Sequence, residues 1–194
     1  ESDMVTWNNL DTLASFKELE EAKKVQLAEV MSGENGAERV KKYSVPMAEG
    51  LAYNYGAKQV DDNILNALAK LAEEAQLTEK YEALYNGEMI NTGEKRLVLH
   101  QLTRGQLGDA VVADGVDKRA FYVEQQTKIA EFVEKVHTGE ITNAAGEKFT
   151  TVVQIGIGGS DLGPRAMYLA LENWAKANDT WKMKAEFISN VDPD

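Results

Sequence analysis

Residues 151–171 read TVVQIGIGGSDLGPRAMYLAL, and this stretch decides the fold. The β-branched, nearly continuous apolar run from Phe149 to Ile157 predicts a strand buried on both faces of a parallel sheet. Pro164 to Ala177 predicts a helix with proline in its first turn, and Lys184 to Val191 predicts a second strand. This order of elements indicates a βαβ unit.

The turn between the first strand and the helix is rich in glycine. A strand that passes directly into a helix presents unpaired N–H groups at the carboxyl edge of the sheet. Gly158 and Gly159 let a ligand approach the backbone, and Ser160 adds a hydroxyl group. The turn suits a small phosphorylated or polyhydroxylated ligand; alternatively, the glycines only permit a tight turn. Asp161 is expected to cap the helix or to accept a hydrogen bond from a neighbouring loop, in preference to contacting a ligand.

Two common phosphate-binding patterns do not fit this turn. The dinucleotide pattern G-x-G-x-x-G requires a third glycine at the position of Asp161. The Walker pattern requires lysine and a hydroxyl residue after Gly163, where Pro164 and Arg165 stand. A Rossmann dehydrogenase and an ordinary NTPase are therefore disfavoured.

Composition limits the possible partners. The 194 residues include 32 acidic and 21 basic side chains, which gives a net charge of -11. Such a charge repels nucleic acid and anionic membranes, although backbone N–H groups can still hold one phosphate. The sequence has no cysteine, no basic-then-apolar secretory start and no apolar run long enough for a membrane helix. We expect a soluble, cytoplasmic protein.

The first part of the chain is mostly helical. Residues 62–77 form one predicted helix, whose apolar stripe is Leu65, Leu68, Leu71, Ala72 and Ala75. Residues 118–137 form another, with Ile129, Phe132, Val133 and Val136 on its expected buried side. Residues 138–148 indicate a connection or small hairpin. We therefore expect a mainly helical region over residues 1–137 and the first βαβ part of an α/β domain over residues 138–194.

Three segments resemble a known family. The stretch VVQIGIGGSDLGPRAM (Val152–Met167) is similar to the first signature region of the glucose-6-phosphate isomerase family, and INTGEKRLVLHQLTRG (Ile90–Gly105) is similar to a second conserved segment. A weaker similarity is SNVD at Ser189–Asp192. The sequence departs from the family pattern at Gly93, Thr103 and Pro193.

The resemblance implies an α/β fold in which a helical N-terminal region precedes a parallel-sheet, three-layer sugar isomerase (SIS) domain. It also implies a homodimer that interconverts glucose 6-phosphate and fructose 6-phosphate in glycolysis and gluconeogenesis, through a cis-enediol and without metal or organic cofactor. Of the family's substrate contacts, only Gly159 and Ser160 fall within this chain. The catalytic arginine, glutamate, histidine and lysine of the family would follow Asp194. Because the chain begins at Glu1 and stops just after a predicted strand, we expect an N-terminal fragment that is inactive alone.

Other charged residues have alternative interpretations. His100 is a catalytic acid or, in the favoured interpretation, a structural residue, since the ring-opening histidine of the family belongs to a later motif. His137 is expected to be a favourable cation at a helix C-terminus. Arg96 and Arg104 could bind phosphate but are expected to pair with carboxylates such as Glu94. A non-catalytic SIS module that senses a sugar phosphate is the alternative function, and the acidic helical region counts against its DNA-binding form.

Overall fold

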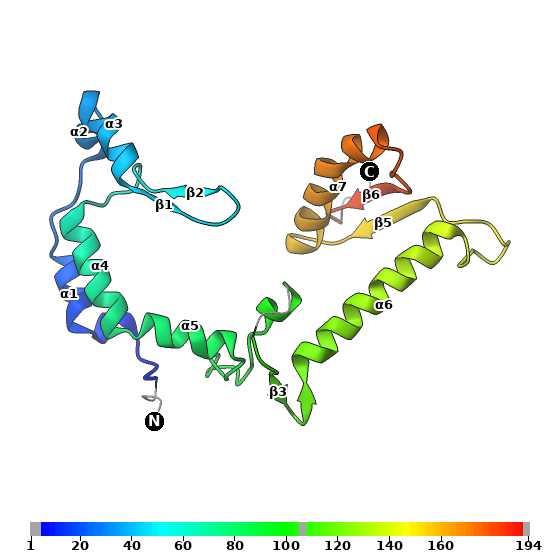
Figure 1. Ribbon diagram of the computed structural model, residues 1–194, viewed down its shortest axis with the longest axis horizontal. Coiled ribbons are helices and arrows are strands. Elements are labelled where there is room, and N and C mark those ends of the chain that lie inside the picture. Colours follow the sequence, from blue (N-terminus) through cyan, green and yellow to red (C-terminus); the bar gives the residue numbers. More distant parts are fainter. Residues whose placement is uncertain (1–4, 105–107, 192–194) are drawn as a thin grey trace. The chain divides into compact units, whose positions relative to one another are not determined.

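The computed structural model describes residues 5–104 and 108–191, which fall into two compact units, 1–111 and 112–194. Both units contain helices and short strands (Figure 1). The first contains, in chain order, η1 (Leu10–Thr12), α1 (Ala14–Glu20), α2 (Leu27–Val30), α3 (Gly33–Lys42), β1 (Ser44–Pro46), β2 (Ala52–Asn54), α4 (Asp62–Glu74), α5 (Leu77–Tyr85) and η2 (His100–Thr103). The second contains β3 (Val112–Ala113), β4 (Val116–Asp117), α6 (Lys118–Thr138), β5 (Thr151–Ile155), α7 (Gly159–Ala177) and β6 (Lys184–Ile188).

Helix α4 packs against α1 in the first unit, where the two lie side by side (Figure 1). It begins where the Asp61 carboxylate accepts a hydrogen bond of 2.8 Å from the Ile64 N–H. The buried side chains of this region are Ile64, Ala67, Leu71 and Ala75. The predicted stripe is thus confirmed at Leu71 and Ala75 and wrong at Leu68, which is 38% exposed. The smaller Ala67, which is 6% exposed, takes an inward position instead.

The predicted helix over residues 62–77 is confirmed as α4, which ends at Glu74, and Leu77 already belongs to α5. Gln76 has φ of 55°, a left-handed conformation that interrupts the helix between α4 and α5. Neither glycine nor proline marks this break in the sequence. The two helices and η1 leave an apolar groove of about 470 Å³ lined by Leu10, Leu65, Leu68, Ala69, Leu71, Ala72, Ala75 and Leu77.

The end of α4 caps the start of α1. The two carboxylate oxygens of Glu74 accept hydrogen bonds of 3.0 Å from the Ala14 N–H and 3.1 Å from the Ser15 N–H. These N–H groups lie in the first turn of α1, where they lack intrahelical partners. Hydrogen bonds from Ser15 lower the pKa of Glu74. The contact joins residues about 60 positions apart in the chain.

A buried arginine holds the connection between the β1–β2 hairpin and α4. Arg39 of α3 is 8% exposed and donates to three backbone carbonyls: Gly56 at 2.7 Å, Lys58 at 2.8 Å and Val60 at 2.6 Å. Its guanidinium also lies 4.7 Å from the centre of the Tyr43 ring. One side chain thus holds three backbone carbonyls of the loop.

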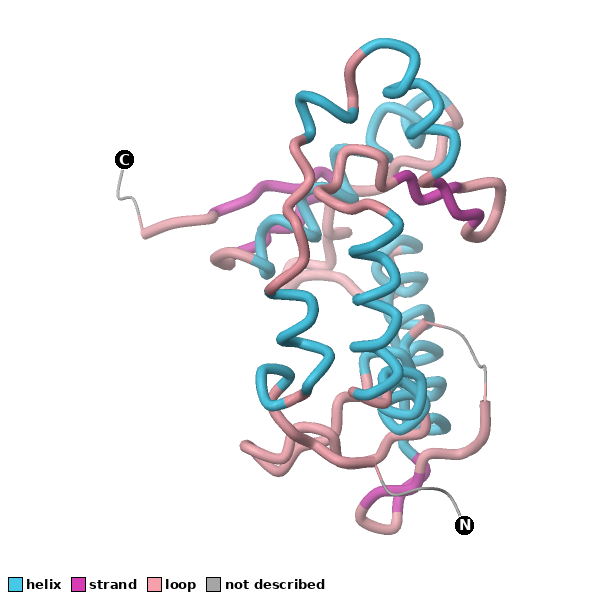
Figure 2. The backbone as a smooth tube through the Cα atoms, turned by 90° about the vertical axis from the view of Figure 1, so that its left-hand side faces the viewer, coloured by secondary structure: helices cyan, strands magenta, loops and turns pink. Residues whose placement is uncertain are grey.

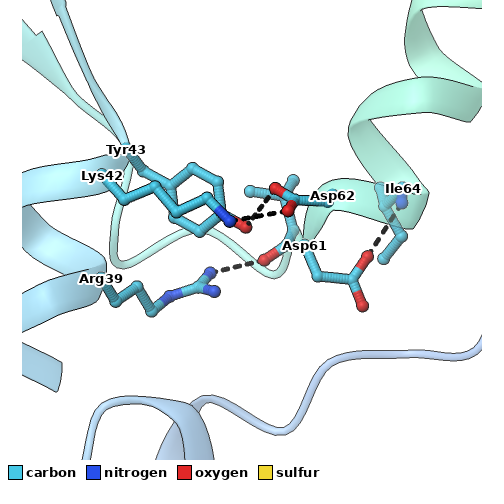
Figure 3. Close-up of polar contacts among 7 residues, drawn as sticks. Arg39, Lys42, Tyr43, Asp61, Asp62 and Ile64 are labelled. Carbon is cyan, nitrogen blue, oxygen red and sulfur yellow. Dashed lines mark hydrogen bonds and ion pairs between the residues drawn. The ribbon is translucent and has the colours of Figure 1, made fainter. Parts of the chain in front are cut away.

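An exposed ion pair lies beside this arginine (Figure 3). Asp62 accepts hydrogen bonds from Lys42 Nζ at 2.6 Å and from the Tyr43 hydroxyl at 3.0 Å. These bonds lower the pKa of the Asp62 carboxyl, and the bond to Asp62 raises the pKa of Lys42. Burial, followed by the bond to Asp62, raises the pKa of Tyr43. The cluster connects the end of α3 to the first turn of α4.

Helix α6 confirms the predicted helix over residues 118–137. Asp117 caps it by accepting hydrogen bonds from the Arg119 and Ala120 N–H groups, and Gly139 ends it in a left-handed conformation with φ of 81°. The expectation that its apolar side is buried is wrong for the described residues, because Ile129 is 62% and Phe132 58% exposed. The spacing of apolar residues in the sequence shows which face of a helix could be buried. It does not show which element packs against that face.

The second unit also contains the predicted βαβ unit. Strands β5 and β6 pair in parallel from Thr151 with Lys184 to Ile155 with Ile188, and α7 contacts both (Figure 2). Before them, a bridge between Thr142 and Lys148 confirms the small hairpin. The expected burial of β5 on both faces is wrong here, since Ile155 is 71% exposed and this sheet has two strands in the described part of the chain. None of the described helices has the length and apolar character to cross a membrane.

Candidate substrate-binding site

The turn after β5 takes its shape from two glycines. The N–H of Gly156 donates to the Ile188 carbonyl at 3.0 Å, which continues the pairing with β6 beyond the strand. A Cβ atom at Gly156 would overlap the Cβ of Ser160, so glycine allows the strand end to meet the helix. Gly158 has φ of 61° and ψ of -120°, a conformation that side chains with a Cβ rarely adopt. The chain reverses sharply at this point.

Helix α7 begins at Gly159, five residues before the predicted start at Pro164. The Gly158 carbonyl accepts hydrogen bonds from the Asp161 N–H at 3.1 Å and the Leu162 N–H at 2.8 Å, and these bonds close the first turn. Proline was predicted at the start of the helix, but Pro164 lies inside α7. Gly159 and Ser160 are therefore the first two residues of α7, and both are exposed. They lie at the carboxyl end of β5, where the sequence places them.

Proline at position 164 leaves a helical carbonyl without its usual donor. In an α-helix the N–H of each residue bonds to the carbonyl four positions earlier, and proline has no N–H. The affected carbonyl is that of Ser160. It accepts instead a hydrogen bond of 3.0 Å from the side-chain amide of Gln154 in β5. The strand thus holds the first turn of the helix through a side chain.

Asp161 forms an ion pair within the helix. It is 4% exposed, and its Oδ1 accepts from Arg165 Nε at 2.9 Å and Nη2 at 2.8 Å. The Arg165 guanidinium lies 5.2 Å from the centre of the Phe187 ring in β6. The expectation that Asp161 caps the helix or bonds to a neighbouring loop is wrong: the helix begins two residues before it, and its partner lies one turn later.

The groups that this turn offers to a ligand are uncharged. They could bind an anion or a hydroxyl group. The N-terminus of the 19-residue helix α7 directs its first N–H groups and a partial positive charge toward the turn. The hydroxyl of Ser160 can donate or accept a hydrogen bond. Across the described residues, no group of three or more histidine, cysteine, aspartate or glutamate side chains could hold a metal ion.

Comparison with known proteins extends beyond this turn. Residues 54–194 match the family model for phosphoglucose isomerase, a range that includes β5, the glycine turn, α7 and β6. The chain belongs to the phosphoglucose isomerase family. The match begins in the first unit, so it also includes α4, α5 and α6.

Several curated members of the phosphoglucose isomerase family align with nearly the whole chain. The glucose-6-phosphate isomerase of Treponema denticola is 58% identical over 193 residues, which cover 97% of this chain and 36% of the relative. That of Treponema pallidum (strain Nichols) is 48% identical, and that of Borreliella burgdorferi (strain B31) is 41% identical; each alignment covers 98% of this chain and 36% of the relative. The chain therefore spans about a third of the length of these relatives.

The second segment that resembles the phosphoglucose isomerase family lies in the first unit. Glu94 bonds to Asn91 through side chain and backbone, at 3.2 and 3.1 Å. The expected ion pair of Glu94 with an arginine is therefore wrong, because the carboxylate closes its own turn. His100 is exposed at the start of η2, and Leu102 of the same segment is 1% exposed. The segment supplies packing through Leu102.

Some predicted features of the phosphoglucose isomerase signatures fall outside the described residues: Gly105 of the second segment, Asp192 of the SNVD stretch, and Pro193, which follows that stretch. His137 is half-buried in the last turn of α6, the position predicted for it, and its role as a favourable cation there stays a prediction. The contact of Gln154 with Ser160 was not predicted from the sequence. Its signal was the proline four positions after Ser160, which removes a helical donor.

Proposed function

We propose that the complete protein to which this chain belongs interconverts glucose 6-phosphate and fructose 6-phosphate, in glycolysis and gluconeogenesis. Membership of the phosphoglucose isomerase family, with relatives named glucose-6-phosphate isomerase at up to 58% identity, is the observation that carries the proposal. A proton beside a carbonyl is weakly acidic, so the reaction needs a carboxylate that moves the proton and donors that stabilise a cis-enediol. The family resemblance supports the expectation that those groups follow residue 194.

We further propose that Gly159 and Ser160 contact the sugar phosphate. Their exposure at the start of α7, and the positive end of the helix dipole, support this role. The Asp161 carboxylate, the nearest acidic group along the chain, is already paired with Arg165. We therefore assign binding to this turn and no catalytic residue to residues 1–194, which we expect to be inactive alone.

We also propose an oligomeric state, a cellular location and a domain organisation for the enzyme. The family resemblance supports a homodimer without metal or organic cofactor, and a role in glycolysis supports a cytoplasmic location. The net charge of -11 supports the absence of nucleic-acid and membrane partners. The change from helices to a βαβ unit supports a helical region over residues 1–137 and the start of an SIS domain over residues 138–194.

Substitution of Gly159 by alanine tests the binding role. A Cβ at Gly159 would meet nothing within 4 Å, and so would one at Gly163 in the same helix. Alanine is the better helix former, so either change should leave stability equal or raise it by about 0.5–1 kcal/mol. Only Gly159→Ala should raise the KM for fructose 6-phosphate, by roughly tenfold or more, because a methyl group there would occupy the space of the ligand.

The assay is coupled conversion of fructose 6-phosphate by the complete protein, beside residues 1–194. An unchanged KM for Gly159→Ala, or an equal increase for Gly163→Ala, would exclude the binding role. If the complete protein binds the sugar phosphate without converting it, the isomerase proposal is wrong. The alternative function, a sugar-phosphate sensor, would then be favoured.

A further inference from the structure

Two features of the sequence combine at Ser160. Pro164 removes the N–H that would bond to the Ser160 carbonyl, and Gln154 donates its side-chain amide to that carbonyl at 3.0 Å. A carbonyl that is free in a helix normally turns to water. Here a half-buried strand residue takes the place of the missing helical donor. The contact crosses from β5 to α7.

The surroundings of Gln154 hold it in position for this contact. Gln154 stands opposite Phe187 in the parallel register of β5 and β6. The Phe187 ring lies beneath the Arg165 guanidinium, which is itself paired with the buried Asp161 carboxylate. The residue after Ser160 is therefore held from β6, and Ser160 itself is held from β5.

Gly156 completes the arrangement. Because it lacks a Cβ, the end of β5 lies against the Ser160 side chain, where any larger residue would overlap the Ser160 Cβ. Ser160 is thus limited on its side-chain face by Gly156 and at its carbonyl by Gln154. Its N–H makes only a long contact of 3.4 Å with the Ile157 carbonyl.

We propose that Gln154 is a positioning residue that fixes the orientation of Ser160, and with it the first turn of α7, for the phosphorylated sugar. The inference rests on the proposed function, in which Ser160 contacts the substrate. Gln154 acts through the backbone of Ser160 and touches no reacting atom. Pro164 keeps the Ser160 carbonyl available to the strand, because any other residue at position 164 could supply the helical N–H.

The substitution Gln154→Met removes the donor and keeps the length of the side chain. In the complete protein it should raise the KM for fructose 6-phosphate by about 2- to 10-fold with little change in kcat, since one hydrogen bond that orders a binding group is lost. Pro164→Ala should have no such effect. The double variant, Gln154→Met with Pro164→Ala, should regain the wild-type KM, because the backbone N–H restored at position 164 can bond to the Ser160 carbonyl. If Gln154 only stabilised the fold, Gln154→Met would lower stability and leave the KM unchanged, so there would be no increase in KM for the double variant to reverse.

Hydrogen exchange gives a second measurement that does not depend on activity. The amides of Asp161 and Leu162, which bond to the Gly158 carbonyl, should exchange faster in Gln154→Met and at the wild-type rate in the double variant. An unchanged KM and unchanged exchange in Gln154→Met, or a failure of Pro164→Ala to restore either, would overturn the inference. A wild-type protein without isomerase activity would overturn the proposed function instead, and hydrogen exchange would still decide whether Gln154 orders the turn.

Discussion

Replacement of Arg39 should loosen the loop between the β1–β2 hairpin and α4. Arg39 supplies three charge-assisted hydrogen bonds to the carbonyls of Gly56, Lys58 and Val60. Such bonds each contribute about 1.5–3 kcal/mol. The bond to Gly56 is buried, whereas the Lys58 and Val60 carbonyls are part-buried and can bind water after the change. We therefore count the first bond in full and discount the others, which gives a loss of about 3 kcal/mol for Arg39→Met.

The local stability of the loop can be measured by hydrogen exchange in the complete protein. The Tyr55, Lys58 and Val60 N–H groups all bond to backbone carbonyls within this region. A loss of about 3 kcal/mol corresponds to roughly 100-fold faster exchange of these amides. Arg39→Lys should fall between Arg39→Met and the wild type, because lysine keeps the charge but lacks the planar fork of donors.

Lys41→Ala is the matched control for Arg39. Lys41 belongs to the same helix, but its side chain is 74% exposed and pairs with Glu38 at 3.3 Å. Exposed pairs of this kind contribute little, so exchange in the loop should stay near the wild-type rate. The three carbonyl contacts do not stabilise the loop if its amides exchange at the wild-type rate in Arg39→Met. The same conclusion follows if they exchange equally fast in Arg39→Met and Lys41→Ala.

Two further substitutions test the glycine turn and the Asp62 cluster. Gly158→Ala should lower the free energy of unfolding in urea by about 1–3 kcal/mol. The cause is the φ of 61° alone, since a Cβ at this position meets nothing within 4 Å. A change below about 0.5 kcal/mol would contradict the argument that alanine is strained here. Lys42 and Tyr43 lower the pKa of Asp62 below its ordinary value of 3.8. The ionised Asp62 therefore stabilises the fold above pH 3.8, and this contribution is lost as the pH falls through the lower pKa of the native state. Carboxyl titration by NMR should therefore place Asp62 below 3.8, and Asp62→Asn should remove that part of the acid sensitivity; an ordinary titration would contradict the observed contacts.

The βαβ unit and helix α6 could be predicted because local sequence determines them. The β-branched run before the glycines predicts β5, and Asp117 and Gly139 bound α6 as its two caps. The turn at Gly158–Ser160 could be located for the same reason, since glycine is needed where φ is positive. These features depend on neighbours within a few residues.

The features that could not be predicted depend on distant partners or on conformations without a residue signal. Gln76 adopts a left-handed conformation for which glutamine gives no signal, so the end of α4 at Glu74 could not be predicted. The partner of Asp161 depends on where α7 begins, and that start was placed five residues too late. Arg39 bonds only to backbone carbonyls, which no pattern of side chains reveals. Burial of an apolar face likewise depends on the element that covers it.

The capping of α1 by Glu74 constrains the order in which the first unit folds. A helix of seven residues is far too short to persist in water without help. Its first N–H groups receive their acceptors only from a carboxylate about 60 positions later in the chain. During synthesis on the ribosome, α1 must therefore remain a coil until α4 has emerged and formed. Helix α1 therefore becomes ordered only after a segment that lies later in the chain.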